Sequence, residues 1–182
     1  MSKYEIRKLD KKGIQHLRES WIPEAEANDE LPASSYVKAV SWAGEVVSGS
    51  ANTEAEVHGV VCEQGEIHAI FDLVAVRPDT PRGYFKIISM VVSPSLDLSA
   101  ASPESSFSIR DQFAAVVAEV IVHGIKLLGE HEKVEKVKFY ASDRVTLSLF
   151  QKVWGSFDTQ TLDELNLQTN AYGNWAEFSK NW

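Results

Sequence analysis

Two polar residues stand inside apolar, strand-like segments and are the candidates for chemistry. Asp72 lies within IFDLVAV, and a carboxyl group among apolar neighbours can have a raised pKa suited to proton transfer. Ser89 is polar within the apolar run 87–92, and a serine hydroxyl becomes a nucleophile when a base lies beside it. The alternative for Asp72 is a strand residue that faces solvent or bonds to a loop. We take Asp72 and Ser89 as the candidate catalytic residues.

Two histidines lie on the strands of a predicted hairpin, 57–76. A regular register around its turn places His58 opposite Phe71 and His68 opposite Val61. Side chains alternate between the faces of a strand, so this register sends the two rings to different faces. It predicts that the two histidines do not form a metal site, and we expect no metal elsewhere in the chain.

The bulk properties limit the classes of function. The chain has 182 residues, which suits one domain over 1–182, and its single cysteine, Cys62, excludes an internal disulfide and a cysteine-rich zinc site. Cys62 lies in an apolar strand pattern and is predicted to be a small core residue. The formal charge of −8, with scattered basic residues, disfavours nucleic acid binding. No apolar run approaches the roughly 20 residues that span a bilayer, so we expect a cytoplasmic protein without membrane contact.

Hydrophobic periodicity predicts strands and helices in alternation. A strand at 4–10 and a helix at 11–21, ended by Pro23, come first. The helix that begins at Ser34 or Ser35 has a thin stripe formed by Val37, Val40, Ser41 and Gly44. The remaining predicted elements are the hairpin 57–76, a central strand at 84–93, a long helix at 102–129 with His123 at the edge of its apolar face, a strand at 134–141, a helix that ends at Gly155 and a last strand at 174–180. This order predicts a sheet that is antiparallel through its hairpins and parallel across the long helix.

The loop from Ser95 to Ser106 joins the central strand to the N-terminus of the long helix. Such junctions hold phosphate groups in many enzymes, because the first helical N–H groups lack internal partners and the helix dipole is positive there. This loop has no glycine and contains carboxylates at Asp97 and Glu104. The hydroxyls of Ser99 and Ser102 are candidate phosphate donors. An ordinary capped linker is the alternative.

Two segments resemble motifs of the GCN5-related N-acetyltransferase (GNAT) superfamily. The segment IISMVVSP, which ends at Pro94, resembles the family's fourth-strand pattern, and residues 143–155 resemble the helix that follows its fifth strand. The resemblance implies an α/β (α+β) fold with a mixed central sheet of about six to seven strands flanked by helices. It also implies acetyl-CoA or another acyl-CoA as donor and a small-molecule or protein amine as acceptor.

The resemblance also assigns roles to positions of this chain. Peptide groups at the end of the family's fourth strand bond the pantetheine arm, which indicates Met90, Val91 and Val92 as donor-binding residues, with a backbone N–H near Val91 polarising the carbonyl. The alternative is that these three residues simply fill the core. The family's proton-donating tyrosine falls on Phe150, and its strand-four acid falls on Ile88.

The sequence therefore predicts a divergent GNAT-like acyltransferase that moves an acetyl or acyl group from a CoA-type thioester to an amine. In this hypothesis water or Asp72 deprotonates the amine. A catalytically inactive GNAT-fold module that binds a protein partner is the alternative, because the loop glycines, the tyrosine and the strand-four acid are all replaced. A donor that lacks the pyrophosphate of CoA, such as an acyl carrier protein or an aminoacyl-tRNA, is a third possibility.

Overall fold

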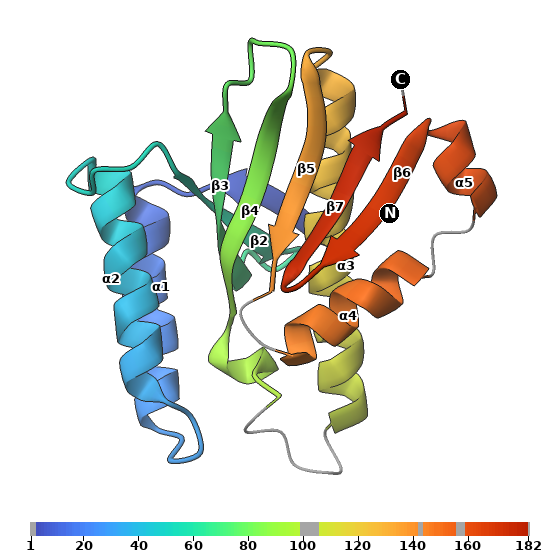
Figure 1. Ribbon diagram of the computed structural model, residues 1–182. Helices are drawn as coiled ribbons and strands as arrows, with labels where there is room; N and C mark the ends of the chain where they lie inside the picture. The colour runs from blue at the N-terminus through green and yellow to red at the C-terminus, as the bar shows by residue number, and fades with distance from the viewer. Residues whose placement is uncertain (1–2, 99–105, 142–143, 156–158, 182) are drawn as a thin grey trace.

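A single mixed sheet organises the chain, in the strand order β1-β2-β3-β4-β5-β7-β6 (Figure 1). The computed structural model describes residues 3–98, 106–141, 144–155 and 159–181. The strands are β1 (Tyr4–Lys8), β2 (Glu56–Cys62), β3 (Ile67–Val76), β4 (Gly83–Val92), β5 (Val134–Tyr140), β6 (Leu167–Tyr172) and β7 (Trp175–Lys180). The helices are α1 (Lys11–Glu26), α2 (Ala33–Ser48), α3 (Ser106–Glu130), α4 (Arg144–Gly155) and α5 (Thr159–Glu164), with a 3-10 turn at Pro94–Leu96. The predicted fold class is confirmed.

The pairing of the strands follows the predicted topology. Strands β1 to β4 form antiparallel neighbours, β4 and β5 run parallel, and β5, β7 and β6 are again antiparallel. Helix α3 makes the crossover from β4 to β5, as a parallel pair requires. The sheet is therefore two antiparallel halves that meet at β4 and β5.

Helices cover the two faces of the sheet through separate apolar clusters. On one face, α1 and α2 pack their buried residues Leu17, Trp21 and Val40 onto β2 and β3 (Figure 1). On the other face, α3 lies across the sheet. A Cβ at Gly124 would lie 2.6 Å from Cζ of Phe139, so only glycine lets α3 approach β5 this closely. The burial of both faces explains the nearly continuous apolar runs in the central strands.

Helix α3 is long and apolar enough to cross a membrane by length and composition alone. An 18-residue window within Ser108–Glu130 has a mean hydropathy of 1.5, so the prediction that no apolar run approaches such a length was wrong. The segment places Phe113, Val116, Val120 and Leu128 in the core against the sheet. In this fold α3 therefore serves as the principal core helix.

Two details of the first helices differ from the predictions. Pro23 does not end α1, which continues to Glu26, and the N–H of Ala27 still bonds to the Pro23 carbonyl at 3.0 Å. Proline lacks only its own N–H donor, and one lost bond near the end of a helix is tolerated. In α2, Val37 is 39% exposed, and the buried stripe is formed by Tyr36, Val40 and Ala43, of which only Val40 was predicted.

The C-terminal region contains a strand that the sequence analysis missed. The weakly patterned segment after α4 forms α5 and β6, and β6 pairs with β7 through a turn at Gly173, whose φ is +55°. The burial of β6 is mostly restricted to Leu167, so its sequence shows little alternation. An edge strand with one buried residue gives no clear period-two signal.

A pair of histidines is packed between the sheet and α3. The rings of His58 and His123 are 5.7 Å apart, and both lie near Phe71, which is the predicted cross-strand partner of His58. Burial lowers the pKa of both histidines, and Glu56 beside His58 only partly opposes this shift. Both rings are therefore held in the neutral form in the folded protein near neutral pH.

This pair predicts a loss of stability in mild acid. Unfolded histidine takes up its proton near pH 6.5, whereas the folded pair does so only at lower pH. The unfolded state binds more protons between these values, so the unfolding free energy falls as pH drops from about 6.5 through the folded pKa. His123→Leu should reduce this slope by up to about 1.4 kcal/mol per pH unit. Urea denaturation from pH 7.5 to 5 measures the slope, and the exposed His16→Leu should leave it unchanged.

Candidate functional site

Strand β4 separates from β5 halfway along its length. In the part of the chain that the structure describes, the β4–β5 ladder ends at the pair Ile87–Phe139, whereas β3 accompanies β4 as far as Val92. The second half of β4 therefore presents one backbone edge that β5 does not cover. An uncovered edge offers N–H and C=O groups to an extended ligand.

A β-bulge lies where the separation begins. Asp72 pairs with Ile88 and Ile70 pairs with Val91, so two β4 residues, Ser89 and Met90, lie opposite one residue of β3. The φ angle of Ser89 is +55°, in the left-handed region that non-glycine residues rarely adopt. Backbone strain of this kind is often found at functional sites. The bulge exposes the Ser89 side chain at the surface of the sheet.

The direction of the peptide groups after the bulge follows from one hydrogen bond. The Ser93 N–H donates to the His68 carbonyl on β3 at 2.9 Å. Peptide groups alternate sides along a strand, so those of Val91 also point to β3, while those of Met90 and Val92 point to the uncovered edge. All three side chains are half-buried rather than fully enclosed.

The structure brings the two predicted catalytic residues together. Asp72 is only 4% exposed, so the alternative in which it faces solvent is wrong. The Trp42 Nε1–H donates to Oδ2 of Asp72 at 3.0 Å, and the Ser89 hydroxyl lies close enough to the same carboxyl group to lower its pKa. Burial raises the pKa of Asp72, and Trp42 and Ser89 oppose that rise without cancelling it. Asp72 is therefore a buried carboxyl group, and the hydroxyl of Ser89 lies between it and the surface.

This arrangement places an acid beside the position where the resemblance expected one. The family's strand-four acid falls on Ile88, and Asp72 is the cross-strand partner of Ile88. Directly paired residues have Cβ atoms about 5 Å apart on the same face. Trp42 completes the site from α2, and the sequence analysis missed it because a 39% exposed tryptophan on a weakly amphipathic helix has no distinguishing pattern.

The loop after β4 is tied to α2. The Tyr36 hydroxyl donates to Oδ2 of Asp97 at 2.7 Å, and burial together with this bond raises the pKa of Tyr36. The carboxylate that the sequence places near a phosphate loop therefore points toward α2. Ser99 and Ser102 lie outside the described residues. Phe150 is a core residue 5.9 Å from the ring of Phe139, so it has no role at the surface.

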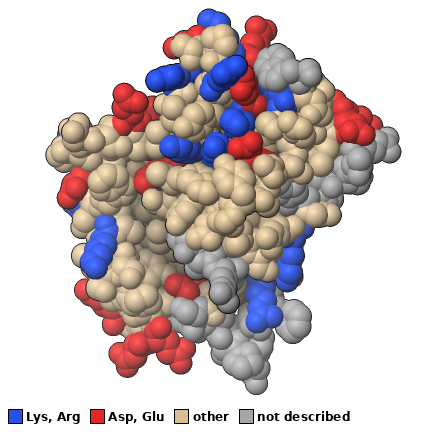
Figure 2. Space-filling model, in the orientation of Figure 1, with Lys and Arg blue, Asp and Glu red and all other residues tan. Residues whose placement is uncertain are grey.

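The face of the sheet next to the bulge is aromatic and basic. Lys86 and Lys138 lie 5.4 Å and 5.2 Å from the centre of the Tyr84 ring, within the range of cation–π contacts. Figure 2 shows Lys and Arg side chains gathered over the upper part of β4 and β5, and acidic side chains at the lower end of α1 and α2. Basic side chains therefore gather on this face although the net charge of the chain is −8, and Glu177 lies among them.

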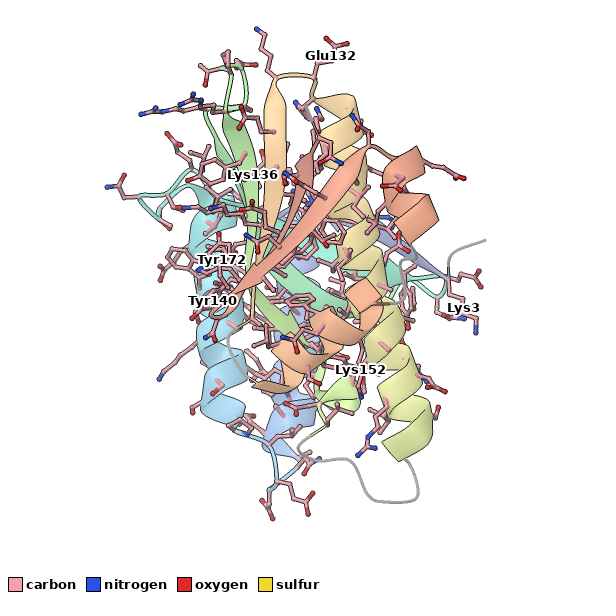
Figure 3. The ribbon with its side chains drawn as sticks, turned by 45° about the vertical axis from the view of Figure 1, so that its right-hand side comes forward. Lys3, Glu132, Lys136, Tyr140, Lys152 and Tyr172 are labelled. Atoms are coloured by element: carbon pink, nitrogen blue, oxygen red, sulfur yellow. The ribbon has the colours of Figure 1, made fainter. Side chains whose placement is uncertain are left out.

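Aromatic side chains continue this face onto β6 and β7. Tyr140 packs on Trp175 with ring centres 5.0 Å apart, and Tyr172 is the cross-strand partner of Trp175. Figure 3 shows Lys136, Tyr172 and Tyr140 following one another along this side of the sheet. A molecule that approaches Ser89 from this side meets aromatic rings and ammonium groups.

Comparisons with known proteins identify the fold of the chain through similar solved structures. No protein-family model and no curated protein matches the sequence. The structure of a probable acetyltransferase from Staphylococcus epidermidis is similar, with a TM-score of 0.52 and 14% identity over 97% of this chain and 98% of that chain. Tetrahymena GCN5 has a TM-score of 0.46 and 12% identity over 98% and 97% of the two chains. An aminoglycoside N(6')acetyltransferase from Legionella pneumophila has a TM-score of 0.47 and 9% identity over 98% and 91%.

The chain therefore has a GNAT-like fold, as the two motif-like segments predicted. The Staphylococcus epidermidis protein supports it over nearly the full length of both chains. At this level of identity the similarity defines the fold and leaves the activity to be argued from the site itself.

The strain at Ser89 predicts an unusual order of stability among variants. Ser89→Gly should be more stable than Ser89→Ala by about 1 kcal/mol, because glycine adopts a positive φ without the steric cost that alanine meets. Urea denaturation of the two variants measures the difference. Ser179, in the regular strand β7, is the matched control, and there the alanine variant should be the more stable one. Equal stabilities at position 89 would contradict a strained bulge.

Proposed function

We propose that this protein transfers an acetyl or acyl group from a CoA-type thioester to an amine. The observation that supports this proposal most directly is the Asp72–Ser89 pair at the bulge, beside the uncovered edge of β4. The pair combines a proton acceptor with an exposed hydroxyl, and the edge provides a place for an extended donor. Both features lie at the point where β4 and β5 separate.

The donor would lie along the uncovered edge of β4. The pantetheine arm of CoA contains two amide groups, and these match the peptide groups of Met90 and Val92 that point away from β3. Such bonds depend on backbone geometry rather than on side chains, which is consistent with the ordinary apolar residues found here. The N–H of Met90 or Val92, rather than that of Val91, would then polarise the thioester carbonyl.

The acceptor amine would approach from the aromatic and basic face. Its nitrogen attacks the carbonyl carbon, the C–S bond breaks, and the electron pair leaves with the thiolate. The attacking nitrogen gives its proton to the exposed Ser89 hydroxyl, which passes its own proton to the carboxylate of Asp72. Trp42 holds the carboxylate in place throughout. Asp72 then returns the proton through Ser89 to the thiolate or to water.

Binding of the donor is tested by thermal unfolding with acetyl-CoA. At 100 times its dissociation constant, acetyl-CoA should add about 2.7 kcal/mol to the unfolding free energy and raise the melting temperature. Val92→Pro removes an N–H from the uncovered edge and leaves the β3 ladder intact, so it should reduce this shift. A pantetheine fragment, in its desthio or its acetyl form, should also raise the melting temperature of the wild-type protein, and Val92→Pro should reduce that shift as well.

A wild-type protein whose melting temperature does not change with millimolar acetyl-CoA would overturn the CoA donor. That result would favour the non-catalytic alternative, in which the fold serves protein–protein binding.

The relay is tested by the rate of thiol release from acetyl-CoA in the presence of a panel of primary amines. Asp72→Asn and Ser89→Ala should each lower kcat/KM by about 100-fold to 10,000-fold, the usual range for acid–base catalysis. The double variant should be no slower than the slower single variant, since both residues act on one proton. The acid limb of the wild-type pH profile should lie above the ordinary pKa of aspartate, because burial raises the pKa of Asp72.

Asp79→Asn, in the exposed loop between β3 and β4, is the matched control and should keep the wild-type rate. Additive losses in the double variant would show that Asp72 and Ser89 act independently and would contradict the relay.

A further inference from the structure

Three side chains of metal-ligand type meet at the tip of the β2–β3 hairpin. They are Cys62, Glu66 and His68, and one ligand atom from each lies within 4.8 Å of the others. A thiolate, a carboxylate and an imidazole form a donor set that suits Zn²⁺. The cluster lies at the end of the hairpin and shares no residue with the candidate site at Ser89.

The turn of the hairpin brings Cys62 and Glu66 face to face. The Cys62 N–H donates to the Glu66 carbonyl and the Gly65 N–H donates to the Cys62 carbonyl, each at 2.9 Å. Gly65 has a φ of +87°, which lets the chain reverse tightly at this point. Residues directly opposite each other across a hairpin point to the same face, so the thiol and the carboxylate are neighbours.

A second β-bulge adds His68 to this pair. Val60 pairs with Ala69 while Val61 pairs with Ile67, so His68 is an extra residue on β3. The prediction that His68 lies opposite Val61 was wrong for this reason. The bulge interrupts the regular alternation of side chains at His68, and the argument from alternation, which concerned a site shared by His58 and His68, does not apply to the residues around Cys62.

The position of the His68 ring agrees with this geometry. The ring lies 5.5 Å from that of Tyr4, and Tyr4 is the β1 partner of Cys62. Cys62 was predicted to be a core residue, but it is only half-buried and remains within reach of solvent. The bulge therefore gathers a histidine, a cysteine and a carboxylate at the accessible end of the β2–β3 hairpin.

The hydrogen bonding of His68 is incomplete among the described residues. Its Nε2 lies 3.5 Å from Oε2 of Glu66, at the limit of a hydrogen bond, and its Nδ1 is buried with no partner in that part of the chain. A buried polar atom without a partner has a free-energy cost that native proteins usually avoid. A metal bond through Nδ1 would compensate for this cost.

We propose that Cys62, Glu66 and His68 bind a zinc ion, with water as the fourth ligand. Bonds of about 2.0 to 2.3 Å in a tetrahedral site separate the ligand atoms by roughly 3.3 to 3.7 Å. The present limit of 4.8 Å exceeds this by about 1 Å, a distance that side-chain rotation covers. A thiolate and a carboxylate carry two negative charges, which neutralise Zn²⁺.

Zinc at this position would hold β2, β3 and the second bulge in one arrangement. The carbonyl of His68 accepts the N–H of Ser93, the residue that directly follows the uncovered edge of β4. The metal would therefore stabilise the hairpin and, through this bond, the end of β4. The binding itself does not depend on the proposed acyl transfer.

The single cysteine makes a cobalt titration decisive, since a thiolate-to-Co²⁺ charge-transfer band must come from Cys62. Reduced, metal-free protein should bind one Co²⁺ with this band and with the strong visible absorption of four-coordinate cobalt. Zn²⁺ should displace the cobalt and raise the melting temperature. Cys62→Ser should abolish the band, and His68→Ala and Glu66→Gln should each weaken binding at least tenfold.

Two exposed residues provide matched controls. His16→Ala lies on α1, and Glu63→Gln lies in the turn itself, and both variants should bind cobalt like the wild-type protein. Three results would overturn the proposal: no charge-transfer band, a stoichiometry that varies between preparations, or an affinity that His68→Ala leaves unchanged. Circular dichroism of each metal-free variant shows that a lost site is not a lost fold.

Discussion

The arrangement of the molecule depends on one constraint, which is that β4 stays paired with β3 to Val92 while it leaves β5 after Ile87. A strand that must part from one neighbour and keep the other has to change its twist, and a bulge does this locally. The extra residue turns Ser89 outward beside Asp72 and leaves the peptide groups of Met90 and Val92 unpaired with β5. The site is therefore a consequence of how the two halves of the sheet separate.

Much of this scaffold is predictable because it depends on repeated, local signals. The apolar run at 84–93, the helix with its wide apolar face and the parallel strand that follows give the central unit, and burial on both faces explains their composition. Because both faces of the central strands are buried, the sequence does not show which face of β3 the Asp72 side chain lies on. Its apolar neighbours on both sides give no alternation, so its burial against Trp42 depends on how α2 packs, which a local pattern does not contain.

The wrong register at His68 and the bulge at Ser89, which the sequence did not predict, have the same physical origin. One extra residue in a strand moves the following side chains relative to their partners, and neither Ser89 nor His68 has a glycine next to it that would mark such a bulge. The position of each bulge depends on the whole sheet. The bulge at Ser89 lies where β4 separates from β5, and the bulge at His68 follows the tight turn at Gly65. In each case the residue that regular alternation would misplace is a polar one, and in each case it joins a cluster that alternation alone would not form.

A comparison of two buried carboxylates explains why Asp72 is the one suited to accept a proton. Glu177 on β7 is nearly as buried, but the ammonium groups of Lys136 and Lys138 lie 3.4 Å and 3.6 Å from its oxygens, so cations offset the cost of burying its charge. The described partners of Asp72 are both neutral, an indole N–H and a hydroxyl. Neutral donors orient a carboxylate without fully stabilising its charge, which is why burial still raises its pKa. A group in this condition gains from taking a proton, and in the proposed reaction the exposed Ser89 hydroxyl at the bulge would carry that proton to it.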